Sequence, residues 1–278
     1  HCPACRSNNF FFWGTTIFVL AGERIFEVMT LIVQGLYFKY GKRPVLEDIS
    51  FQAHKGEILA ILGKNGTGKT TLLKCINRIL TPYKGDVFVD GRSISQLSRT
   101  DLARNIGDIE QKHTATHTTG FDSVLLGRKP YFLWDITAKD MQIASQALEM
   151  LGLGAYAMRF TDELSGGELQ KVAVARALAQ EPGVLLMDEP TSNLDLKNQL
   201  EVLKTIRNIA RQKQIAVAVV MHDLNMALRY ADRFVLLKDR RLFQCGKIDD
   251  LTSESIEAVY SVPVELVSCQ SQRVVVPL

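Results

Sequence analysis

The 278-residue sequence has no long apolar run, little net charge and few cysteines. A membrane-spanning helix needs about 20 consecutive apolar residues, and no run reaches that length. The net charge is only +3 and the longest basic cluster is the short one at 238–241, which gives no argument for a nucleic-acid partner. The five cysteines are odd in number, and Cys75, Cys245 and Cys269 are isolated, which favours a reducing compartment over a disulfide scaffold. The remaining composition, 46% hydrophobic and 23% charged, suits one large or two small α/β domains.

A glycine-rich segment follows the apolar run 58–62, and a helical pattern begins at Leu72. Strand, glycine-rich turn and helix in this order predict a phosphate-binding loop, in which backbone N–H groups and the helix N-terminus face phosphate oxygens. We expect Lys69 to reach the β- and γ-phosphates and the Thr70 hydroxyl to hold Mg²⁺. The nucleotide-binding residues predicted here are Gly63, Lys64, Asn65, Gly66, Thr67, Gly68, Lys69, Thr70 and Thr71. The chain is therefore predicted to bind a nucleoside triphosphate.

The run Val-Leu-Leu-Met-Asp-Glu at 184–189 helps to indicate which kind of nucleotide-binding protein this is. A GTPase should carry a guanine-reading Asn-Lys-x-Asp motif, which this sequence lacks. The run is bounded by prolines and predicts a buried parallel strand whose carboxyl end faces the phosphates. Asp188 would then bind Mg²⁺ directly or through water, and Glu189 would act as the general base. The alternative for such an acidic pair is a solvated loop.

A second candidate for anion binding is the segment Leu-Ser-Gly-Gly-Glu-Leu-Gln at 164–170. Ser165 is suited to cap a helix, and the glycines leave N–H groups open to an anion. By itself the segment could be only a capped helix start. The glycine-rich loop and this segment are thus both suited to bind an anion. One ATP could therefore be held by one such site from each of two chains, the loop of one and this segment of the other.

Together these segments resemble the ATPase subunit of an ABC transporter, over about residues 30–262. The resemblance implies that Ser165, Gly166, Gly167 and Glu168 form the signature that binds the ATP held by a partner copy. Glu168 departs from the glutamine that is commonest there. It also implies an α/β fold of the P-loop NTPase class, with a mixed-sheet core, an antiparallel β subdomain and a helical insert.

Four further residues match the motifs of that family. Tyr40 matches the aromatic residue that stacks on adenine, with Tyr37 and Phe38 as competitors, and Asp195 matches the D-loop at the dimer seam. Gln111 matches the Q-loop glutamine that contacts Mg²⁺ and senses the γ-phosphate. His222 matches the switch histidine that contacts the γ-phosphate. The Q-loop carries Asp108 and Glu110 where an aromatic residue and a proline are usual, but it keeps Gln111.

The chain is expected to divide into three parts. Residues 1–28 are expected to be a non-native or disordered extension, 29–262 the ATPase domain with a helical insert at about 112–163, and 263–278 a C-terminal tail. Apolar spacing predicts a helix at Lys139–Leu151 in the insert. The Cys-Pro-Ala-Cys run at 2–5 is half of a zinc site, and the histidines of 113–117 are more consistent with a solvated loop than with a metal site.

The implied function is ATP hydrolysis, with ATP and Mg²⁺ bound in a homodimer at the cytoplasmic face of the cell membrane. Partners would be two transmembrane permease subunits, with a substrate-binding protein acting through them, and no nucleic acid. The segments that most resemble iron–siderophore, haem and cobalamin importer ATPases are Gly35–Gly41, Val124–Pro130, His222–Asn225 and Val259–Val262. An iron complex is favoured.

Three alternatives stay open. The cargo could be another one, such as molybdate. A non-transport ABC ATPase acting in DNA repair or on ribosomes would be expected to carry a long coiled coil or two cassettes. An idle regulatory cassette would be expected to have lost Lys69, Glu189 or His222, and all three are present.

Overall fold

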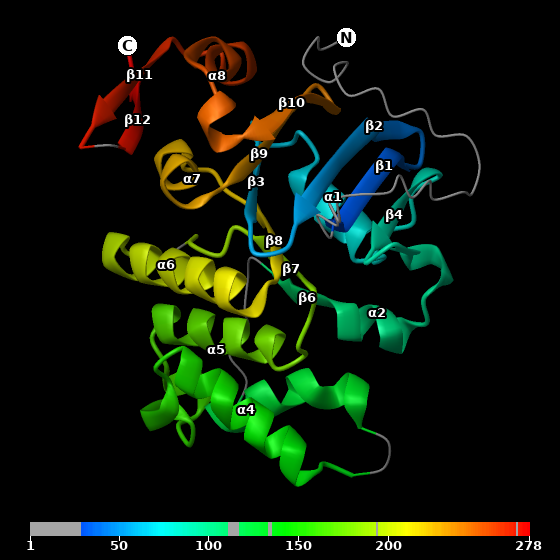
Figure 1. The fold of residues 1–278 in the computed structure, drawn as a ribbon, viewed down its shortest axis with the longest axis vertical. Coiled ribbons are helices and arrows are strands. Elements are labelled where there is room, and N and C mark those ends of the chain that lie inside the picture. The colour runs from blue at the N-terminus through cyan, green and yellow to red at the C-terminus, as the bar shows by residue number, and fades with distance from the viewer. Residues whose placement is uncertain (1–28, 111–116, 133–134, 193, 271) are drawn as a thin grey trace, which may run out of the picture.

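The computed structural model describes residues 29–110, 117–132, 135–192, 194–270 and 272–278 (Figure 1). A six-stranded sheet in the order β10-β9-β3-β8-β7-β6 forms its centre. Its neighbouring strands pair in parallel, except that β10 pairs antiparallel with β9. These strands are β3 (Ile58–Leu62), β6 (Ile106–Ile109), β7 (Val184–Asp188), β8 (Ala216–Val220), β9 (Arg233–Lys238) and β10 (Arg241–Lys247). The mixed sheet expected from the sequence is confirmed.

A second, antiparallel sheet has the order β2-β1-β4-β5. Its strands are β1 (Met29–Tyr40), β2 (Arg43–His54), β4 (Lys84–Val89) and β5 (Arg92–Ser93). The antiparallel β subdomain implied by the resemblance is confirmed. The turn between β1 and β2 contains Gly41 at φ 56°, a backbone conformation that glycine adopts without strain.

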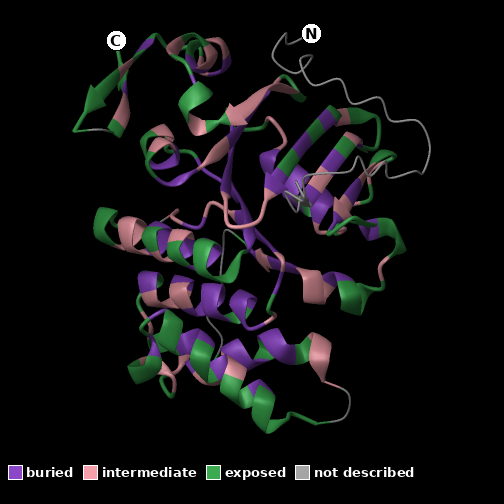
Figure 2. Cartoon of the chain, in the orientation of Figure 1, coloured by how far each residue is buried: buried purple, intermediate pink, exposed green. Residues whose placement is uncertain are grey.

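Side chains alternate between the two faces of the central sheet, and both faces are buried (Figure 2). Leu59 and Ile61 of β3 pack with α1 (Lys69–Ile76) and the antiparallel sheet. Ile58, Ala60 and Leu62 pack on the opposite face, with helices from the second half of the chain. Because both faces are covered, the strands are continuously apolar rather than alternating.

The helical part of the chain lies on one side of the central sheet, with α4 stacked on α5 and α5 on α6 (Figure 1). In chain order, the helices described between β5 and β8 are η2 (Ile94–Gln96), α2 (Arg99–Asn105), α3 (Gly120–Leu125), η3 (Leu126–Tyr131), α4 (Ala138–Met150), η4 (Gly154–Tyr156), η5 (Thr161–Glu163), α5 (Gly166–Leu178) and α6 (Leu196–Lys213). The helix predicted at 139–151 is therefore α4, which begins at a capping box between Thr137 and Asp140. The proposed limits of the insert remain a prediction.

A buried arginine joins three elements of this helical part. Arg128 is 3% exposed, and its Nε donates to Asp140 Oδ1 on α4 at 3.0 Å. Its Nη1 donates to the Ala179 carbonyl at 2.9 Å and to Glu181 Oε2 at 2.8 Å, just beyond α5. The buried charge is thus paired and hydrogen-bonded, which satisfies a group that would otherwise be costly to bury.

The last residues, expected from the sequence to be a tail, form a β-hairpin. After β8, in addition to β9 and β10, the chain forms α7 (Leu224–Tyr230), η6 (Ile248–Asp250), α8 (Ser253–Tyr260), β11 (Val264–Cys269) and β12 (Gln272–Pro277). Val264 and Val275 of the hairpin are buried in the core cluster, and β12 packs on α7. Among the described residues, no helix is both long and apolar enough to span a membrane.

Candidate functional site

The glycine-rich loop lies between the carboxyl end of β3 and the first residue of α1. Gly63, Gly66 and Gly68 have φ of 146°, 80° and 99°. A Cβ on Gly63 would lie 2.6 Å from the Leu237 carbonyl oxygen, and one on Gly68 would lie 2.8 Å from Leu46 Cδ2. Both glycines are therefore required by packing as well as by backbone conformation.

Lys69, the first residue of α1, folds back over this loop. It is 5% exposed, and its Nζ donates to the carbonyl oxygens of Gly63 at 2.8 Å and Lys64 at 2.9 Å. Burial lowers the pKa of Lys69, while the nearby carboxylates of Glu189 and Asp188 act in the opposite direction. The ammonium group is held by two neutral acceptors, and charge-assisted hydrogen bonds to phosphate oxygens would be stronger than these.

Asp188 ends β7 beside the start of α1. The Thr70 hydroxyl hydrogen-bonds the Asp188 carboxylate, while Oδ1 of Asp188 is buried with no hydrogen-bond partner. Burial raises the pKa of Asp188, and the Thr70 hydrogen bond opposes that rise. A hydroxyl beside an unsatisfied carboxylate oxygen is a donor set that suits Mg²⁺, a hard cation that prefers oxygen ligands. Thr70 and Asp188 therefore fit the predicted metal role, which remains a proposal.

Glu189 and His222 meet at the same edge of the sheet. Glu189 follows β7 in the left-handed region at φ 51°, and its N–H donates to the Val220 carbonyl at 3.2 Å. Oε1 of Glu189 hydrogen-bonds Nε2 of His222. Because β8 lies between β3 and β7, the ends of these three parallel strands bring the loop, the acidic pair and His222 together.

One cavity of about 410 Å³ contains most of these predicted residues. Its lining residues are Val45, Asn65, Gly66, Gly68, Lys69, Thr70, Thr71, Glu189 and His222. The cavity thus joins the phosphate-binding loop to the proposed base and switch residue.

A neighbouring cavity of about 230 Å³ shares Thr70 and adds Asp108, Glu110 and Asp188. Burial, with added contributions from Glu110 and Asp188, raises the pKa of Asp108 to about 6, although a hydrogen bond from Asn77 at 3.0 Å opposes the rise. The two acidic residues noted as unusual in the sequence therefore increase the negative charge beside Thr70. Gln111 itself lies outside the described residues.

Ser165 caps α5 in the helical part of the molecule. Its Oγ donates to Glu168 Oε2 at 2.7 Å, its N–H donates to the same oxygen at 2.8 Å, and Glu168 N–H donates to Ser165 Oγ at 3.4 Å. These hydrogen bonds from Ser165 lower the pKa of Glu168. Gly167 packs closely, since a Cβ there would lie 2.9 Å from Asn198.

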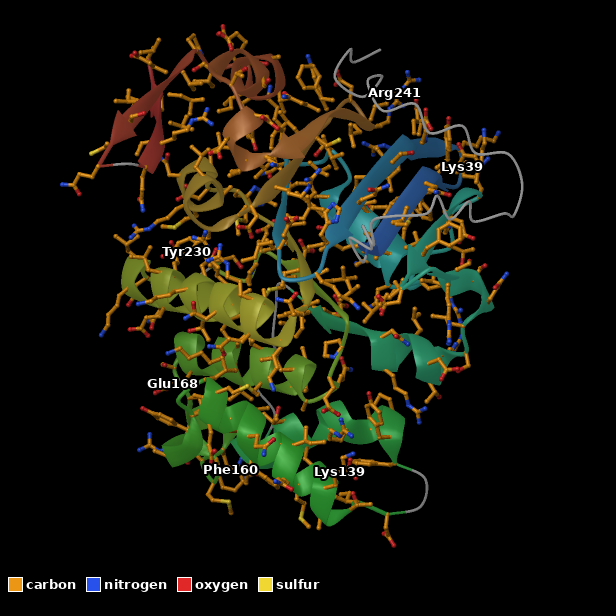
Figure 3. All side chains as sticks on the ribbon, in the orientation of Figure 1. Lys39, Lys139, Phe160, Glu168, Tyr230 and Arg241 are labelled. Carbon is orange, nitrogen blue, oxygen red and sulfur yellow. The ribbon has the colours of Figure 1, made fainter. Side chains whose placement is uncertain are left out.

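The signature segment and the P-loop cavity are separate in a single chain. Among the described residues that line that cavity, none comes from 164–170. Glu168 is labelled in the helical part in Figure 3, well apart from Lys39 on the antiparallel sheet. The two segments predicted to bind anions are therefore not joined within one chain.

The remaining predicted residues lie at the surface. Tyr40 is 51% exposed at the end of β1 and contacts Phe38 edge-to-face, with ring centroids 4.9 Å apart. Phe38 is only 6% exposed, and Tyr37 faces Tyr83, so Tyr40 is the aromatic best placed to stack on a base. Asp195 caps α6, where its Oδ1 accepts from Asn198 N–H at 2.8 Å. Its D-loop role remains a prediction.

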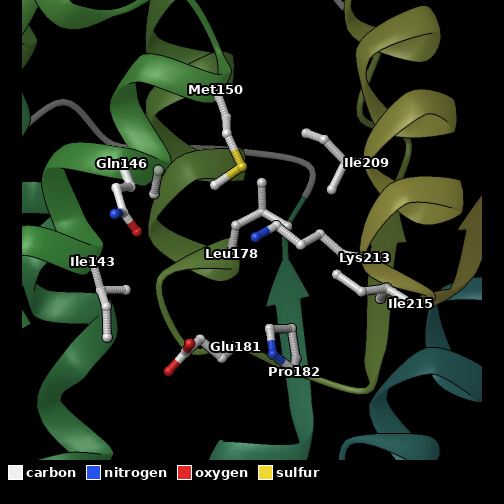
Figure 4. Close-up of a pocket in the computed structure, with 10 residues that line it drawn as sticks. Ile143, Gln146, Met150, Leu178, Glu181, Pro182, Ile209, Lys213 and Ile215 are labelled. Carbon is white, nitrogen blue, oxygen red and sulfur yellow. The ribbon is translucent and has the colours of Figure 1, made fainter.

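A third cavity, of about 160 Å³, lies between α4, the end of α5 and α6 (Figure 4). Ile143, Met150 and Leu178 are among its apolar lining residues, and Glu181 and Lys213 also line it. The described residues of this lining include none of the predicted nucleotide-binding residues. It is a packing gap between the helical part and the core.

The fold and the P-loop site define an ATP-hydrolysing protein of the P-loop NTPase class. A protein-family profile described as ABC transporter matches residues 46–192, and the chain belongs to that family.

Two relatives and two solved structures extend the match. The chain is 49% identical over 252 residues to an uncharacterized ABC transporter ATP-binding protein of Methanocaldococcus jannaschii, covering 91% of this chain and 99% of the relative. It is 34% identical over 229 residues to the petrobactin import ATP-binding protein FpuD of Bacillus anthracis, covering 81% and 84%. Its fold matches a metal-chelate type ABC transporter in an inward-facing conformation, with a TM-score of 0.79, 32% identity and coverage of 90% and 98%. It also matches a dimeric ATP-binding cassette in a post-hydrolysis state with ADP and Pi, with a TM-score of 0.68, 28% identity and coverage of 78% and 98%.

These matches confirm the fold class and the ATPase assignment made from the sequence. Two features of the site were missed. Tyr260 and Ser261 contact the phosphate-binding loop, and the terminal hairpin contacts α7. Only the hairpin itself had a signal in the sequence, since two valine-containing segments, 264–267 and 274–276, are separated by polar residues.

Proposed function

We propose that the chain is the ATP-hydrolysing subunit of an ABC importer, acting as a homodimer that couples ATP binding and hydrolysis to uptake of an iron complex. The observation that carries the proposal is the single cavity that unites Lys69, Thr70, Glu189 and His222. The iron-complex cargo is supported by the similarity to the petrobactin importer subunit and to the metal-chelate transporter. Haem and cobalamin are the next candidates.

In the proposed reaction, Lys69 binds the β- and γ-phosphates. Glu189 takes the proton of the attacking water, and His222 holds Glu189 in place and contacts the γ-phosphate. Mg²⁺, held by Thr70, Asp188 and Gln111, would neutralise charge on the phosphates. Tyr40 would stack on adenine, an interaction of about 1–3 kcal/mol.

The homodimer is proposed because the second anion-binding segment stands apart from the cavity of its own chain. In a two-fold dimer, Ser165, Gly166 and Gly167 of each copy would close on the ATP held by the other, with Asp195 at the seam. Ser165 would then exchange its hydrogen bond to Glu168 for one to the γ-phosphate. ATP thus favours the closed dimer, and hydrolysis removes the contact that held it.

We place the chain at the cytoplasmic face of the membrane, bound to two permease subunits that receive cargo from a substrate-binding protein. The helical part presents exposed apolar side chains that such subunits would cover: Leu126 at 55%, Ile136 at 48%, Met141 at 45% and Met158 at 78% exposed. Scattered exposed apolar residues are ordinary, but four within one subdomain are consistent with a protein interface.

The test is to recover tagged Glu189→Gln chain from detergent-solubilised membranes with ATP and to identify the proteins bound to it. A polytopic permease, and a binding protein through it, would support import. The identity of the permease would narrow the choice of cargo among an iron complex, haem, cobalamin and an oxyanion such as molybdate. Ribosomal or DNA-bound proteins without a membrane subunit would overturn the transport role.

A further inference from the structure

The end of α8 contacts the start of the phosphate-binding loop, 197 residues away in the sequence. The Tyr260 hydroxyl oxygen accepts a hydrogen bond from Gly63 N–H at 3.0 Å. Beside it, Lys64 Nζ donates to Ser261 Oγ at 2.9 Å. Two consecutive residues of the C-terminal segment thus hold two consecutive residues of the loop.

These two loop residues are also the ones that hold Lys69. The Lys69 ammonium donates to the carbonyl oxygens of Gly63 and Lys64. We propose that Tyr260 and Ser261 are positioning residues for ATP binding, which fix Gly63 and Lys64 so that Lys69 and the loop N–H groups are preorganised for phosphate. The inference rests on the proposed nucleotide-binding role of this loop.

The supporting segment is itself firmly anchored. Ile256 and Val259 of α8 are 0% and 2% exposed, and the Tyr260 ring packs against the same core cluster. Ser253 at the start of α8 accepts a hydrogen bond from Leu266 N–H of β11 at 3.1 Å. Burial raises the pKa of Tyr260, so the phenol is neutral at physiological pH. A neutral hydroxyl on a rigid helix end can hold an N–H group in one orientation.

The same segment also contacts the element that follows His222. Asn225 Oδ1, on α7, accepts from Val275 N–H of β12 at 2.7 Å, and Asn225 Nδ2 donates to the Val275 carbonyl at 3.4 Å. Asp223, which caps α7, is adjacent to His222 in the sequence. Residues 253–278 therefore support two separate walls of the nucleotide cavity, through Tyr260 at the loop and Asn225 near His222.

The proposal predicts a reciprocal effect. If the C-terminal segment preorganises the loop for nucleotide, nucleotide binding must stabilise the contact between them by the same free energy. Hydrogen exchange in peptides covering 253–278 should therefore slow when MgATP is added. A segment that only completes the core would be protected no more than the rest of the core, which nucleotide binding stabilises as a whole.

The test compares Tyr260→Phe with Tyr131→Phe in the full chain. Tyr131 is a matched control because its hydroxyl also bonds a backbone group, the Gln180 carbonyl at 2.9 Å, in the helical part of the molecule. Both substitutions keep the ring. We expect the Kd for Mg–mant-ATP to rise about fivefold in Tyr260→Phe, the effect of losing one hydrogen bond, and to stay near the wild-type value in Tyr131→Phe.

Ser261→Gly is the second variant, since glycine suits the left-handed backbone at Ser261, which has φ 58°. It should raise the Kd about twofold, because the lost bond is exposed and weaker. Loss of the MgATP-dependent protection of 253–278 in Tyr260→Phe would support the inference. If the wild type binds mant-ATP but Tyr260→Phe equals Tyr131→Phe in both measurements, the inference is wrong. If the wild type does not bind mant-ATP at all, the proposed function itself fails.

Discussion

His222 and Glu189 are hydrogen-bonded to each other across the carboxyl ends of neighbouring strands β8 and β7. The side chain of Glu189 is only 17% exposed and that of His222 is 44% exposed, so the carboxylate is the more sheltered of the two. The imidazole fixes one carboxylate oxygen of Glu189. This arrangement suits a general base whose orientation must be set before water attacks.

Glu189→Gln should reduce ATP turnover at least about a hundredfold, because an amide cannot accept the proton of the attacking water. The variant should still bind ATP and remain dimeric in its presence. Phosphate release under steady-state conditions and light scattering with ATP measure the two effects. Glu149→Gln, on the exposed face of α4, is the control and should behave as the wild type. Turnover in Glu189→Gln close to that of the control would disprove the base assignment.

Ser165→Arg should abolish hydrolysis while leaving ATP binding by the monomer intact, because an arginine side chain would occupy the place of the partner's phosphate. Loss of the helix cap costs about 1 kcal/mol by itself. Ser98→Arg controls for that loss, since Ser98 caps α2 through Asp101 N–H at 3.0 Å.

Mixing the inactive variants Ser165→Arg and Lys69→Ala tests the composite site directly. A mixed dimer contains one intact site, with the loop of the first variant and the signature of the second. ATPase activity should therefore reappear on mixing. If the mixture stays inactive although both chains fold and dimerise, the two-chain site is incorrect.

Protonation of the Asp108 carboxylate should make the free energy of unfolding depend on pH. Burial raises its pKa from 3.8 to about 6, so the folded state binds this proton more tightly than the unfolded state does. The folded state is therefore favoured at low pH, and that advantage is lost as pH rises from about 4 to about 6. Asp108→Asn has no such loss, and titrating groups that do not interact with Asp108 cancel in the comparison.

The free energy of unfolding of Asp108→Asn, relative to the wild type, should thus increase by about 1–3 kcal/mol between pH 4 and pH 7. Urea unfolding with EDTA present measures it. A difference between the two proteins that does not change with pH would contradict the prediction.

The catalytic edge of the sheet was predictable from local sequence. Fully apolar runs indicated parallel strands covered on both faces, and parallel strands place their carboxyl ends at one edge. The run 184–189 was therefore expected to bring Asp188 and Glu189 to the phosphate-binding loop, whereas His222 was assigned from the family resemblance. In the described structure Glu189 and His222 line one cavity with loop residues, and Asp188 lies beside Thr70.

Contacts between distant segments were not predictable in this way. The Tyr260–Gly63 hydrogen bond joins residues 197 apart, and a tyrosine near the end of a helix has no pattern that identifies its partner. The capping box of Ser165 and Glu168, by contrast, follows directly from Ser-x-x-Glu before an apolar helix. Local chemistry could be inferred from spacing, whereas tertiary partners depend on the packed fold.

The close packing of η3 on α5 supports the last prediction. A Cβ on Gly127 would lie 2.1 Å from the Arg176 carbonyl oxygen and 3.2 Å from Ala179 Cβ. Gly127→Ala must therefore push η3 away from α5. This overpacking should reduce the free energy of unfolding by about 1–3 kcal/mol. Gly154→Ala is the control, because a Cβ there meets nothing within 4 Å.

Because α5 begins at the signature, Gly127→Ala should also impair hydrolysis more than ATP binding by the monomer. Displacing α5 moves Ser165 relative to the core but leaves the P-loop in place. Chemical denaturation, mant-ATP binding and ATPase assays on both variants separate these effects. Equal stability of Gly127→Ala and Gly154→Ala would show that η3 and α5 are less tightly packed than the structure indicates. Impaired mant-ATP binding in Gly127→Ala would instead show that the helical part supports the loop itself.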